Sequence, residues 1–477
     1  MRKNKKRILS AVLSLLLLAL TILPGCAPKE ITLRVLTEAS NPHNQGHSRF
    51  YDQLDTLIEQ FMVEHEDVNV VVERLPEAGT EREYAIERLR ASIMAGKGPD
   101  ILVMPSPGTN IYFGAPDEIT NEDVLFPDVE QAMHNGLFYD LSEFYDADSE
   151  LDKDGLVTSV MDAGTVGDAR YLLPLRYNFP VAYVYPEKLE GSGLDLEIFD
   201  QNMVDLMNTI AESNVEWLIA DSTFLNLESS ILNYFPQLID YDSQETRIDK
   251  EDLVAFLQSY RTLHSIDRSL PPSACAKAVV YVAIGSFWPQ TGHGMYIGDL
   301  DSAIEHAAIA KVTGYEIEMF PLKAMDGSLI ADITYYGAIG AGCKEPELAY
   351  ELLRQLLGEE TQNQTTATGS GVNGFALAAS GWPVRSKGVV QKIYRNFYAK
   401  ILKGNGFDAE RKARENQLKF IDLTDEDIPI LQTTVDQARF SIPWEKTLGQ
   451  LADEDRLAID VAVDEWLGNL KWHLAEG

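Results

Sequence analysis

The stretch Ala95-Gly96-Lys97-Gly98-Pro99-Asp100-Ile101-Leu102-Val103-Met104 joins the end of one predicted element to the whole of the next. Its two glycines and its proline end a helix predicted over residues 82–95, because both residue types stop helices. Residues 100–104 then form a strand that is apolar after its first residue. Such a continuous apolar run is typical of a strand that is buried on both faces of a parallel sheet.

The residues before this stretch already alternate between strand and helix. Residues 31–36 alternate apolar and polar side chains, and residues 68–73 are rich in valine, so both are predicted to be strands. Between them, residues 48–65 carry apolar side chains on one helical face: Phe50, Leu54, Leu57, Ile58 and Phe61. This order of strands and helices predicts an α/β fold with a largely parallel sheet.

Length and charge set limits on the rest of the chain. The 477 residues are too many for one ordinary core and indicate two domains, which the 45% of apolar residues are sufficient to fill. A formal net charge of −34 repels nucleic acid and anionic lipid, so neither is an expected partner surface. The sequence has no internal repeat and no low-complexity linker that would mark a domain boundary.

The N-terminus has the pattern of an export signal. Five basic residues within residues 2–7 precede an apolar run over residues 8–23, which is short for a membrane span. The run ends in Leu23-Pro24-Gly25-Cys26, which resembles the lipobox of bacterial lipoproteins. The resemblance implies that residues 1–25 are a signal peptide and that acyl chains such as palmitate on Cys26 anchor the protein at the extracellular face of the cell membrane. An ordinary signal peptide or an uncleaved anchor remains the alternative.

Several short patterns lack the context that their chemistry needs. Residues 369–374 match G-x-G-x-x-G but follow a polar stretch instead of a strand. Residues 150–161 resemble a calcium loop without the glutamate at its twelfth position. His43 and His47 have the spacing of a metal pair but lie in a predicted loop. We therefore expect no catalytic residue, no metal site and no cofactor.

Besides Cys26, the chain contains Cys275 and Cys343. A disulfide between them stays open, because they are far apart in the sequence and one pair has no diagnostic spacing. Two buried free thiols are the favoured interpretation, because free cysteine is among the most buried residue types.

Several segments, in a fixed order, carry a resemblance to one family. The segments are residues 95–101, 136–141, 173–178, 182–185, 294–299, 319–322, 340–350 and 381–385. Together they resemble the extracellular solute-binding proteins of ABC importers, in the maltose-binding-protein-like, carbohydrate-type group. One departure is Tyr185-Pro186-Glu187-Lys188, which stands where the family usually has Tyr-Asn-Lys.

The resemblance implies a two-lobed periplasmic-binding-protein-like fold, in which each lobe is a mainly parallel sheet with flanking helices. The expected lobes are residues 26–180 plus 315–362 and residues 181–314 plus 363–477. They would be joined by residues 173–185, a stretch near Phe320 and residues 361–374, and would close on a ligand in the cleft between them.

The implied function is that of a monomeric, membrane-anchored receptor, not an enzyme. It would deliver a small-molecule solute to the transmembrane subunits of an ABC permease. A surface-anchored enzyme acting on polysaccharide and a ligand sensor for a membrane signalling protein are the alternatives. A sugar or oligosaccharide is the favoured ligand, while oligopeptide, polyol, polyamine and acidic sugar remain open.

The resemblance also implies which residues line the cleft. Aromatic faces suit the C–H faces of sugar rings, and polar side chains suit hydroxyl groups. The expected ligand-binding residues are Glu38, Asn41, Ser106, Arg176, Asn178, Trp288, Asp299, Tyr335, Tyr336 and Trp382. Tyr335 and Tyr336 are predicted to be an exposed pair. Trp288 and Tyr336 are the favoured residues for stacking on the ligand. The alternative for all the aromatic residues is that they pack in the core. At the C-terminus, apolar residues at helical spacing between Ile459 and Leu474 predict a core helix.

Overall fold

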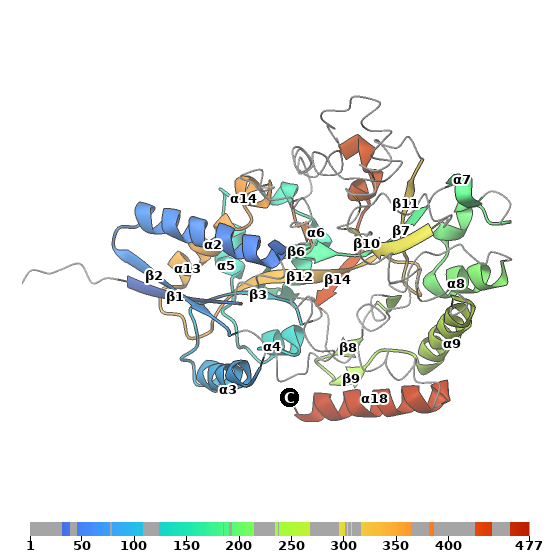
Figure 1. The fold of residues 1–477 in the computed structure, drawn as a ribbon. Helices are drawn as coiled ribbons and strands as arrows, with labels where there is room; N and C mark the ends of the chain where they lie inside the picture. The colour runs from blue at the N-terminus through green and yellow to red at the C-terminus, as the bar shows by residue number, and fades with distance from the viewer. Residues whose placement is uncertain are drawn as a thin grey trace, which may run out of the picture.

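A computed structural model gives the fold over most of the chain. It describes residues 31–38, 45–76, 79–107, 124–184, 186–189, 193–213, 234–236, 238–267, 295–300, 303, 307, 316–363, 381–385, 425–440 and 458–476. Figure 1 shows these residues as an α/β molecule with a long sheet on one side and a group of helices on the other.

In the described part of the chain, the largest sheet is mixed and contains seven strands in the order β13-β6-β12-β3-β1-β2, with β14 also paired to β12. Its strands are β1 (Ile31–Thr37), β2 (Val68–Arg74), β3 (Ile101–Pro105), β6 (Leu172–Asn178), β12 (Ile330–Ile339), β13 (Trp382–Pro383) and β14 (Gln437–Phe440). The first three strands are parallel, as the sequence predicts, but β12 runs antiparallel to both β3 and β6. The sheet is therefore mixed because β12 comes from a distant segment and enters between β3 and β6 in the opposite direction.

Helices cover both faces of this sheet (Figure 1). α2 (Gln45–Glu64) and α13 (Pro346–Gln355) lie on one face, and α3 (Thr80–Met94) and α4 (Val129–His134) lie on the other. α13 packs so closely on β12 that a Cβ atom at Gly337 would come within 2.9 Å of Leu353 Cδ2. Gly96 follows α3 with a φ of 66°, a conformation that glycine adopts without steric cost, so the stretch that ends the helix does so as predicted.

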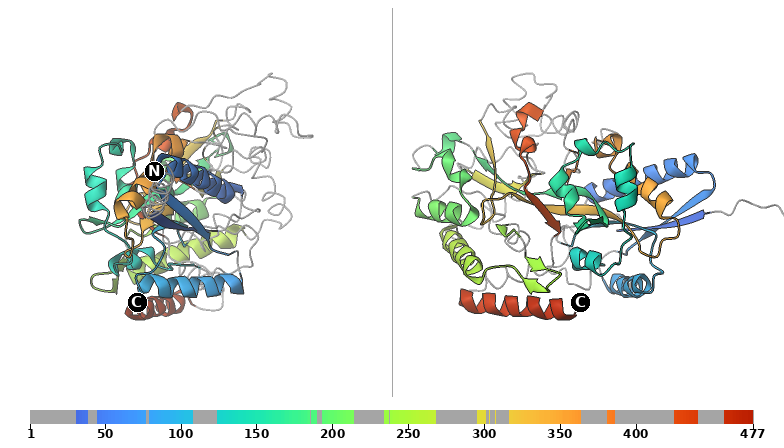
Figure 2. Two further views of the ribbon diagram at one scale, coloured as in Figure 1. Left: turned by 90° about the vertical axis from the view of Figure 1, so that its left-hand side faces the viewer. Right: turned by 180° about the vertical axis from the view of Figure 1, so that it is seen from behind.

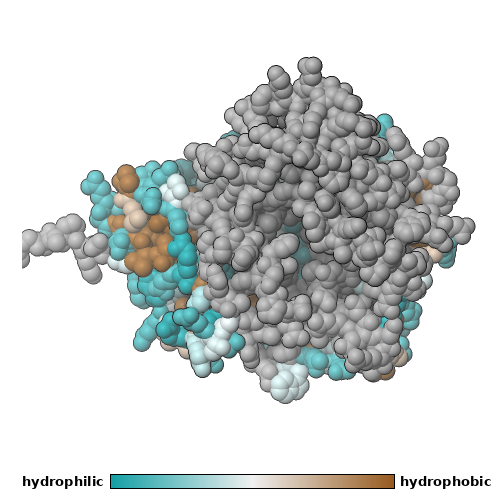
Figure 3. Space-filling model, in the orientation of Figure 1, coloured by the Kyte–Doolittle hydropathy of each residue, from teal (hydrophilic) through white to brown (hydrophobic). Residues whose placement is uncertain are grey.

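β2 forms one edge of the large sheet. Val71 on this strand is exposed, as is Val63 near the end of α2. Figure 3 shows apolar surface at this end of the molecule, surrounded by hydrophilic side chains.

A second sheet contains three strands, with β7 (Pro180–Val184) between β10 (Met295–Asp299) and β11 (Glu318–Pro321). Both neighbours run antiparallel to β7, so the prediction of a mainly parallel sheet in the second lobe is wrong for the described strands. The alternation of strands and helices that indicates parallel pairing covers residues 31–104. No such alternation in the sequence specifies the direction of β10 or β11.

The remaining described elements are short strands and the helices beside the two sheets. The strands are β4 (Thr165–Val166), β5 (Ala169–Arg170), β8 (Ile239–Asp240) and β9 (Glu245–Thr246). The α-helices are α5 (Ser142–Ala147), α6 (Thr158–Asp162), α7 (Pro186–Leu189), α8 (Met203–Glu212), α9 (Lys250–Asp267), α14 (Glu359–Asn363) and α18 (Ile459–Glu476). The 3-10 helices are η1 (Lys153–Gly155), η2 (Leu196–Asp200), η9 (Asp425–Asp427) and η10 (Pro429–Gln432).

The buried apolar side chains of the described residues form two hydrophobic clusters. The first cluster surrounds the large sheet, and the second lies among β7, α8, α9 and α18. β7 belongs to both, because Val181 and Tyr183 pack in the first cluster while Ala182 and Val184 pack in the second. This division follows from the alternation of side chains along a strand.

The lobe boundaries stay a prediction, but the clusters divide the chain differently. Trp382, Val384 and Phe440 pack in the first cluster, whereas the predicted boundaries assign residues 363–477 to the second lobe. β13 and β14 return to the large sheet by pairing with β6 and β12, which explains their position.

The C-terminal helix α18 lies where its apolar stripe predicts, in the second cluster. Figures 1 and 2 both show it along one side of the molecule, next to the β8–β9 hairpin. None of the helices in the described part of the chain combines the length and apolarity that crossing a bilayer requires.

Cys343 is a buried free thiol, as expected, and burial raises its pKa to about 12. Cys275 lies outside the described residues, so whether the two cysteines pair stays untested.

Two tryptophans of α18 provide a matched test of the second cluster. Trp466 is 2% exposed and Trp472 is 66% exposed. We expect Trp466→Ala to lower the free energy of unfolding by about 3–5 kcal/mol, because it leaves a cavity in the core. Trp472→Ala should change it by less than about 0.5 kcal/mol. Chemical denaturation of both variants measures this difference, and equal effects would contradict the assigned orientation of the helix.

Candidate functional site

Most of the predicted ligand-binding residues lie at one level of the large sheet. Ser106 follows β3, and its N–H donates to the carbonyl oxygen of Thr334 on β12 at 2.8 Å. Tyr335 is opposite Pro105 on one side and Arg176 on the other. We call Glu38, Ser106, Arg176, Tyr335, Tyr336 and Trp382 the sheet-end row, because they lie on or just after adjacent strands, where β1 and β3 end. Ligands of open α/β sheets bind near such strand ends.

Every residue of the sheet-end row is buried. The expectation that Tyr335 and Tyr336 form an exposed pair is therefore wrong. They lie on β12, which has β3 on one side and β6 on the other, so the sheet itself encloses them. The ring of Tyr336 also packs edge-on against Phe440, with centroids 5.5 Å apart, and its burial raises its pKa far above the ordinary value.

Glu38 has a partner within the protein. Its two carboxylate oxygens accept hydrogen bonds from Arg82 Nη1 at 2.6 Å and Arg82 Nη2 at 2.7 Å. Both side chains are buried, so this bidentate ion pair ties α3 to the end of β1. The pair accounts for the burial of Glu38 without a ligand.

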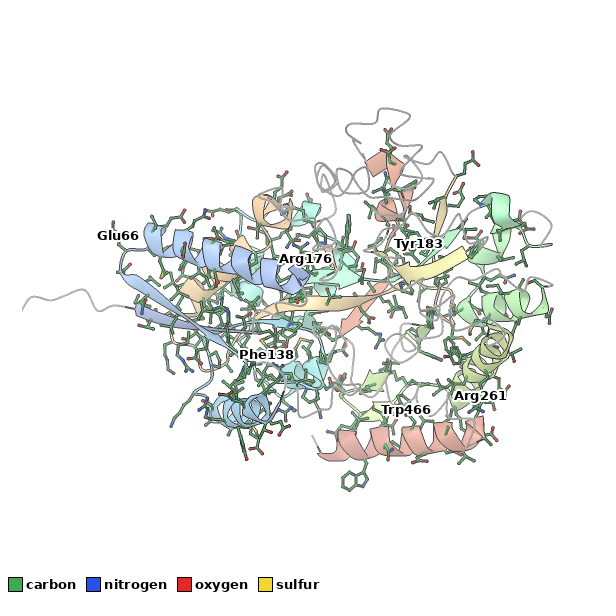
Figure 4. The ribbon with its side chains drawn as sticks, in the orientation of Figure 1. Glu66, Phe138, Arg176, Tyr183, Arg261 and Trp466 are labelled. Atoms are coloured by element: carbon green, nitrogen blue, oxygen red, sulfur yellow. The ribbon has the colours of Figure 1, made fainter. Side chains whose placement is uncertain are left out.

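Arg176 is buried without a partner of this kind. Its Nε and Nη1 atoms have no hydrogen-bond partner, and burial lowers its pKa to about 10. Other donor atoms on nearby strands also lack a hydrogen-bond partner, among them Thr37 Oγ1, Ser106 Oγ and Trp382 Nε1. Figure 4 labels Arg176 near the middle of the large sheet.

The other predicted residues that the structure describes, Asn178 and Asp299, are not part of this row. Asn178 is half-buried on β6, opposite Asp332 of β12. Asp299 ends β10 and is opposite Pro180 of β7. Asn41, Trp288 and the predicted lipid attachment site Cys26 lie outside the described residues.

A cavity of about 420 Å³ lies between the two hydrophobic clusters. It is lined on one side by residues of α4, α6 and β14 and on the other by residues next to or in the β8–β9 hairpin: Glu130, Ser159, Asp162, Ala163, Pro236, Leu238, Ile239, Tyr241, Asp436, Gln437, Ala438, Arg439 and Phe440. A second cavity of about 330 Å³ shares Glu130, Ala163, Tyr241 and Ala438 with it, so the two adjoin. Phe440 connects this cavity to the sheet-end row through Tyr336.

None of the predicted ligand-binding residues that the structure describes lines this cavity. Sequence reasoning missed Glu130, Tyr241 and Arg439, which come from three distant segments. The sequence contains one weak indication of where this part of the cavity begins: Asp128 precedes an apolar helix start and is a typical N-cap residue. It could have indicated where α4 begins but not that Glu130 faces a cavity.

A hydrogen-bonded contact between described residues joins the two walls of this cavity. Tyr241, in the turn between β8 and β9, donates its hydroxyl hydrogen to the carboxylate of Asp128, with O–O distances of 2.9 and 2.8 Å. Asp128 also caps α4 by accepting from the N–H of Gln131 at 2.8 Å. The imidazole of His134 stacks on the Tyr241 ring, with centroids 5.0 Å apart.

Burial perturbs both carboxylates beside this contact. Burial raises the pKa of Asp128 to about 6, although its hydrogen bonds from Gln131 and Tyr241 oppose the shift. Burial raises the pKa of Glu130 to about 7, and the nearby charge of Asp128 adds to the effect. The cavity therefore offers acceptors and donors for a polar ligand, with a carboxyl group that changes charge near neutral pH.

Comparison with known proteins supports the fold. No protein-family model matches the sequence, and no curated protein matches it. The chain is similar to a periplasmic oligogalacturonide-binding protein from Yersinia enterocolitica, with 14% identity, a TM-score of 0.51, and coverage of 94% of this chain and 99% of that one. It is similar to a sugar transporter from Rhizobium etli in an open conformation, with 15% identity, a TM-score of 0.51, and coverage of 92% and 99%.

A de novo designed cysteine esterase is also similar, with 14% identity, a TM-score of 0.53, and coverage of 94% of this chain and 99% of that one. At these identities the likeness shows a shared fold, which agrees with the α/β architecture described above.

The carboxyl group of Glu130 gives the site a pH dependence that can be measured. A pKa raised to about 7 means that Glu130 contributes stability at low pH, which is lost as the pH rises from its ordinary pKa toward 7. Between about pH 5 and pH 8, the free energy of unfolding should fall by roughly 1–2 kcal/mol more in the wild-type protein than in Glu130→Gln. The expected fall is smaller than the free energy that corresponds to the whole pKa shift, because the side chain of Glu130 is partly exposed to solvent.

Denaturant titrations across this pH range measure the effect. Glu87→Gln, on the exposed side of α3, is the matched control and should keep the wild-type profile. Parallel pH profiles for the wild-type protein and Glu130→Gln would contradict the prediction.

Proposed function

We propose that the protein is an extracellular solute-binding receptor of an ABC importer, which captures a small polar solute between two lobes. The observation that carries this proposal is the cavity of about 420 Å³ between the two hydrophobic clusters. Its volume lies in the usual range for small-molecule sites, and both clusters contribute residues to it. The shared fold with binding proteins for sugars supports the same proposal.

The lining of the cavity suits a sugar or oligosaccharide. Tyr241 and Phe440 provide aromatic rings, while Ser159, Gln437 and Arg439 provide polar groups for hydroxyls. A neutral sugar would gain many hydrogen bonds here without bringing a charge into a site that already contains carboxylates.

The proposed motion is closure of the two lobes on the solute. β6 and β7 are separated by only one residue, so the chain passes directly from the large sheet to the second sheet. A cavity between two bodies that are connected in this way can change shape when those bodies rotate. We propose that the closed form is the one that delivers solute to a permease.

We further propose that acyl chains on Cys26 hold the receptor at the outer face of the membrane. The basis is the charged start, the short apolar run and the lipobox-like Leu23-Pro24-Gly25-Cys26. More than one acyl chain would be needed, because a single chain binds a bilayer only marginally.

The receptor function can be tested with purified protein and a panel of sugars, oligosaccharides, polyols and peptides. The solute should raise the melting temperature, because it binds the native state alone, and should reduce the radius of gyration in small-angle scattering. Ala438→Trp should abolish both effects by filling the cavity, while Val461→Trp on the exposed side of α18 should preserve them. Saturating binding without compaction would contradict closure, and binding that survives in Ala438→Trp would locate the solute outside this cavity.

Anchoring is tested separately by fractionating cells. Cys26→Ala should release the protein from the membrane fraction or leave an uncut precursor, because it removes the acylated thiol. Cys343→Ala is the control, because it removes a cysteine far from the signal region and should leave fractionation unchanged. A Cys26→Ala variant that fractionates and migrates as the wild-type protein does would exclude acylation there.

A further inference from the structure

We propose that the end of the large sheet at which β1 begins is the surface that faces the bilayer in the anchored protein, where it meets a zwitterionic layer of lipid headgroups. This inference rests on the proposed acylation of Cys26 and adds to it a protein surface and an orientation. It follows from the length of chain between Cys26 and β1, and from the side chains that surround the start of β1.

The chain between the proposed anchor and the folded body is short. Residues 27–30 alone separate Cys26 from Ile31, the first residue of β1. Whatever conformation they adopt, five residues of chain reach at most about 18 Å. The helix α2, with 20 residues, is longer than this, at roughly 30 Å. The tether is therefore too short to let the body turn freely above a membrane to which Cys26 is attached.

The first residue of β1 is held in place, so the folded part adds no slack to the tether. The N–H of Ile31 donates to the carbonyl oxygen of Asp67 at 2.9 Å, and Ile31 is opposite Val68 in the parallel pair of β1 and β2. The N–H of Val68 donates to the carbonyl oxygen of His65 at 2.9 Å, which closes the turn between α2 and β2. The end of α2 and this turn therefore lie beside the point where the tether leaves. We call Ile31, Val63, Glu64 and residues 65–67 the anchor-side surface.

The anchor-side surface is far from the cavity. Figure 4 labels Glu66 at one end of the molecule, whereas Arg261 and Trp466 lie toward the other. Measured along the paired strands β1, β3 and β12, Phe440 of the cavity lining is about ten residues from Ile31, or roughly 30 Å at the rise of a strand. A molecule that meets the bilayer with its anchor-side surface therefore holds its cavity away from the lipid, where dissolved solute reaches it.

The side chains of this surface suit contact with headgroups without entry into the hydrocarbon. Val63 is 77% exposed, and Figure 3 shows apolar surface at this end of the molecule. Three exposed acidic residues follow Val63 in the sequence: Glu64, Glu66 and Asp67. Carboxylates are costly in the hydrocarbon core and are repelled by anionic lipid. They therefore keep the surface at the level of the headgroups of a bilayer without net charge.

A second copy of the chain fits this surface less well than lipid does. In a symmetric pair each surface faces its own copy, so the acidic residues of the two copies would oppose one another. His65 does not relieve this repulsion, because it already lies 3.3 Å from Glu351 of the same chain. A headgroup layer without net charge brings no such repulsion.

The first experiment compares fluorescent labels at two ends of the acylated protein in phosphatidylcholine vesicles. Val63→Cys and Trp472→Cys provide labelling sites of similar exposure, 77% and 66%, in a Cys275→Ser background in which Cys343 is buried. A nitroxide on the lipid headgroup should quench the label at position 63 at least about 3-fold more than the label at position 472, because the tether reaches so short a distance. Equal quenching, or stronger quenching at position 472, would overturn the proposal.

The second experiment lengthens the tether in the same two labelled proteins. A flexible Gly-Ser insert of about 20 residues after Ala27 adds a root-mean-square reach of roughly 25 Å, so the quenching of the two labels should become similar. A difference that survives unchanged with the longer tether would show that tether length does not set the orientation, and the proposal would fall.

Two further outcomes separate this inference from those on which it rests. Protein without acyl chains on Cys26 would overturn both the anchoring and this inference, whereas acylated protein with equal quenching would overturn this inference alone. Sedimentation of Cys26→Ala tests the second copy as the occupant of the surface. A monomer is expected, and a dimer that Val63→Glu dissociates would assign the surface to self-association and overturn the proposal.

Discussion

The passage of one chain segment through both hydrophobic clusters is the constraint on which the rest of the structure depends. β6 and β7 are separated only by Phe179, and the side chains of β7 alternate between the clusters. Since successive side chains of a strand point to opposite sides, Val181 and Ala182 cannot pack in the same cluster. β7 therefore contributes side chains to both clusters, and neither cluster is complete without it. Figure 4 labels Tyr183 on this strand, between the large sheet and the helices of the second cluster.

The same constraint explains why a cavity occurs where it does. Two cores that share one strand diverge away from it, and the space between α4 and β14 on one side and the β8–β9 hairpin on the other is left unfilled by apolar side chains. Among the described residues, the hydrogen bond from Tyr241 to Asp128 and the stacking of Tyr241 on His134 cross this space. A polar contact of this kind forms and breaks at little net cost, because water can replace either partner. Such an interface is compatible with opening and closing, whereas a continuous apolar interface would resist separation.

The buried charged groups named above, all from the described residues, fall into two classes. Glu38 with Arg82, and Arg385 with Asp152, hold elements together, and each depends on hydrogen bonds between the partners. Arg176, Asp128 and Glu130 instead carry perturbed pKa values with burial as the largest cause. Shifts of this kind cluster at functional sites, because a group held away from water is ready to respond to a ligand or a proton. Arg176 lies in the sheet-end row, whereas Asp128 and Glu130 lie on the α4 side of the cavity.

The sequence by itself determined the local elements: the strands at β1, β2 and β3, the end of α3 at Gly96, and the apolar stripe of α18. These depend on periodicity and on glycine and proline, which act over a few residues. It also selected six residues that the fold gathers into the sheet-end row. Only the tertiary structure decided that β12 enters the sheet antiparallel, which buries Tyr335 and Tyr336, and that β13 and β14 return to the first cluster. Pairing between segments that lie far apart in the sequence leaves no periodic signal in either segment. For the same reason, nothing in the sequence showed that Arg82 satisfies Glu38 while Arg176 is left without a counter-charge.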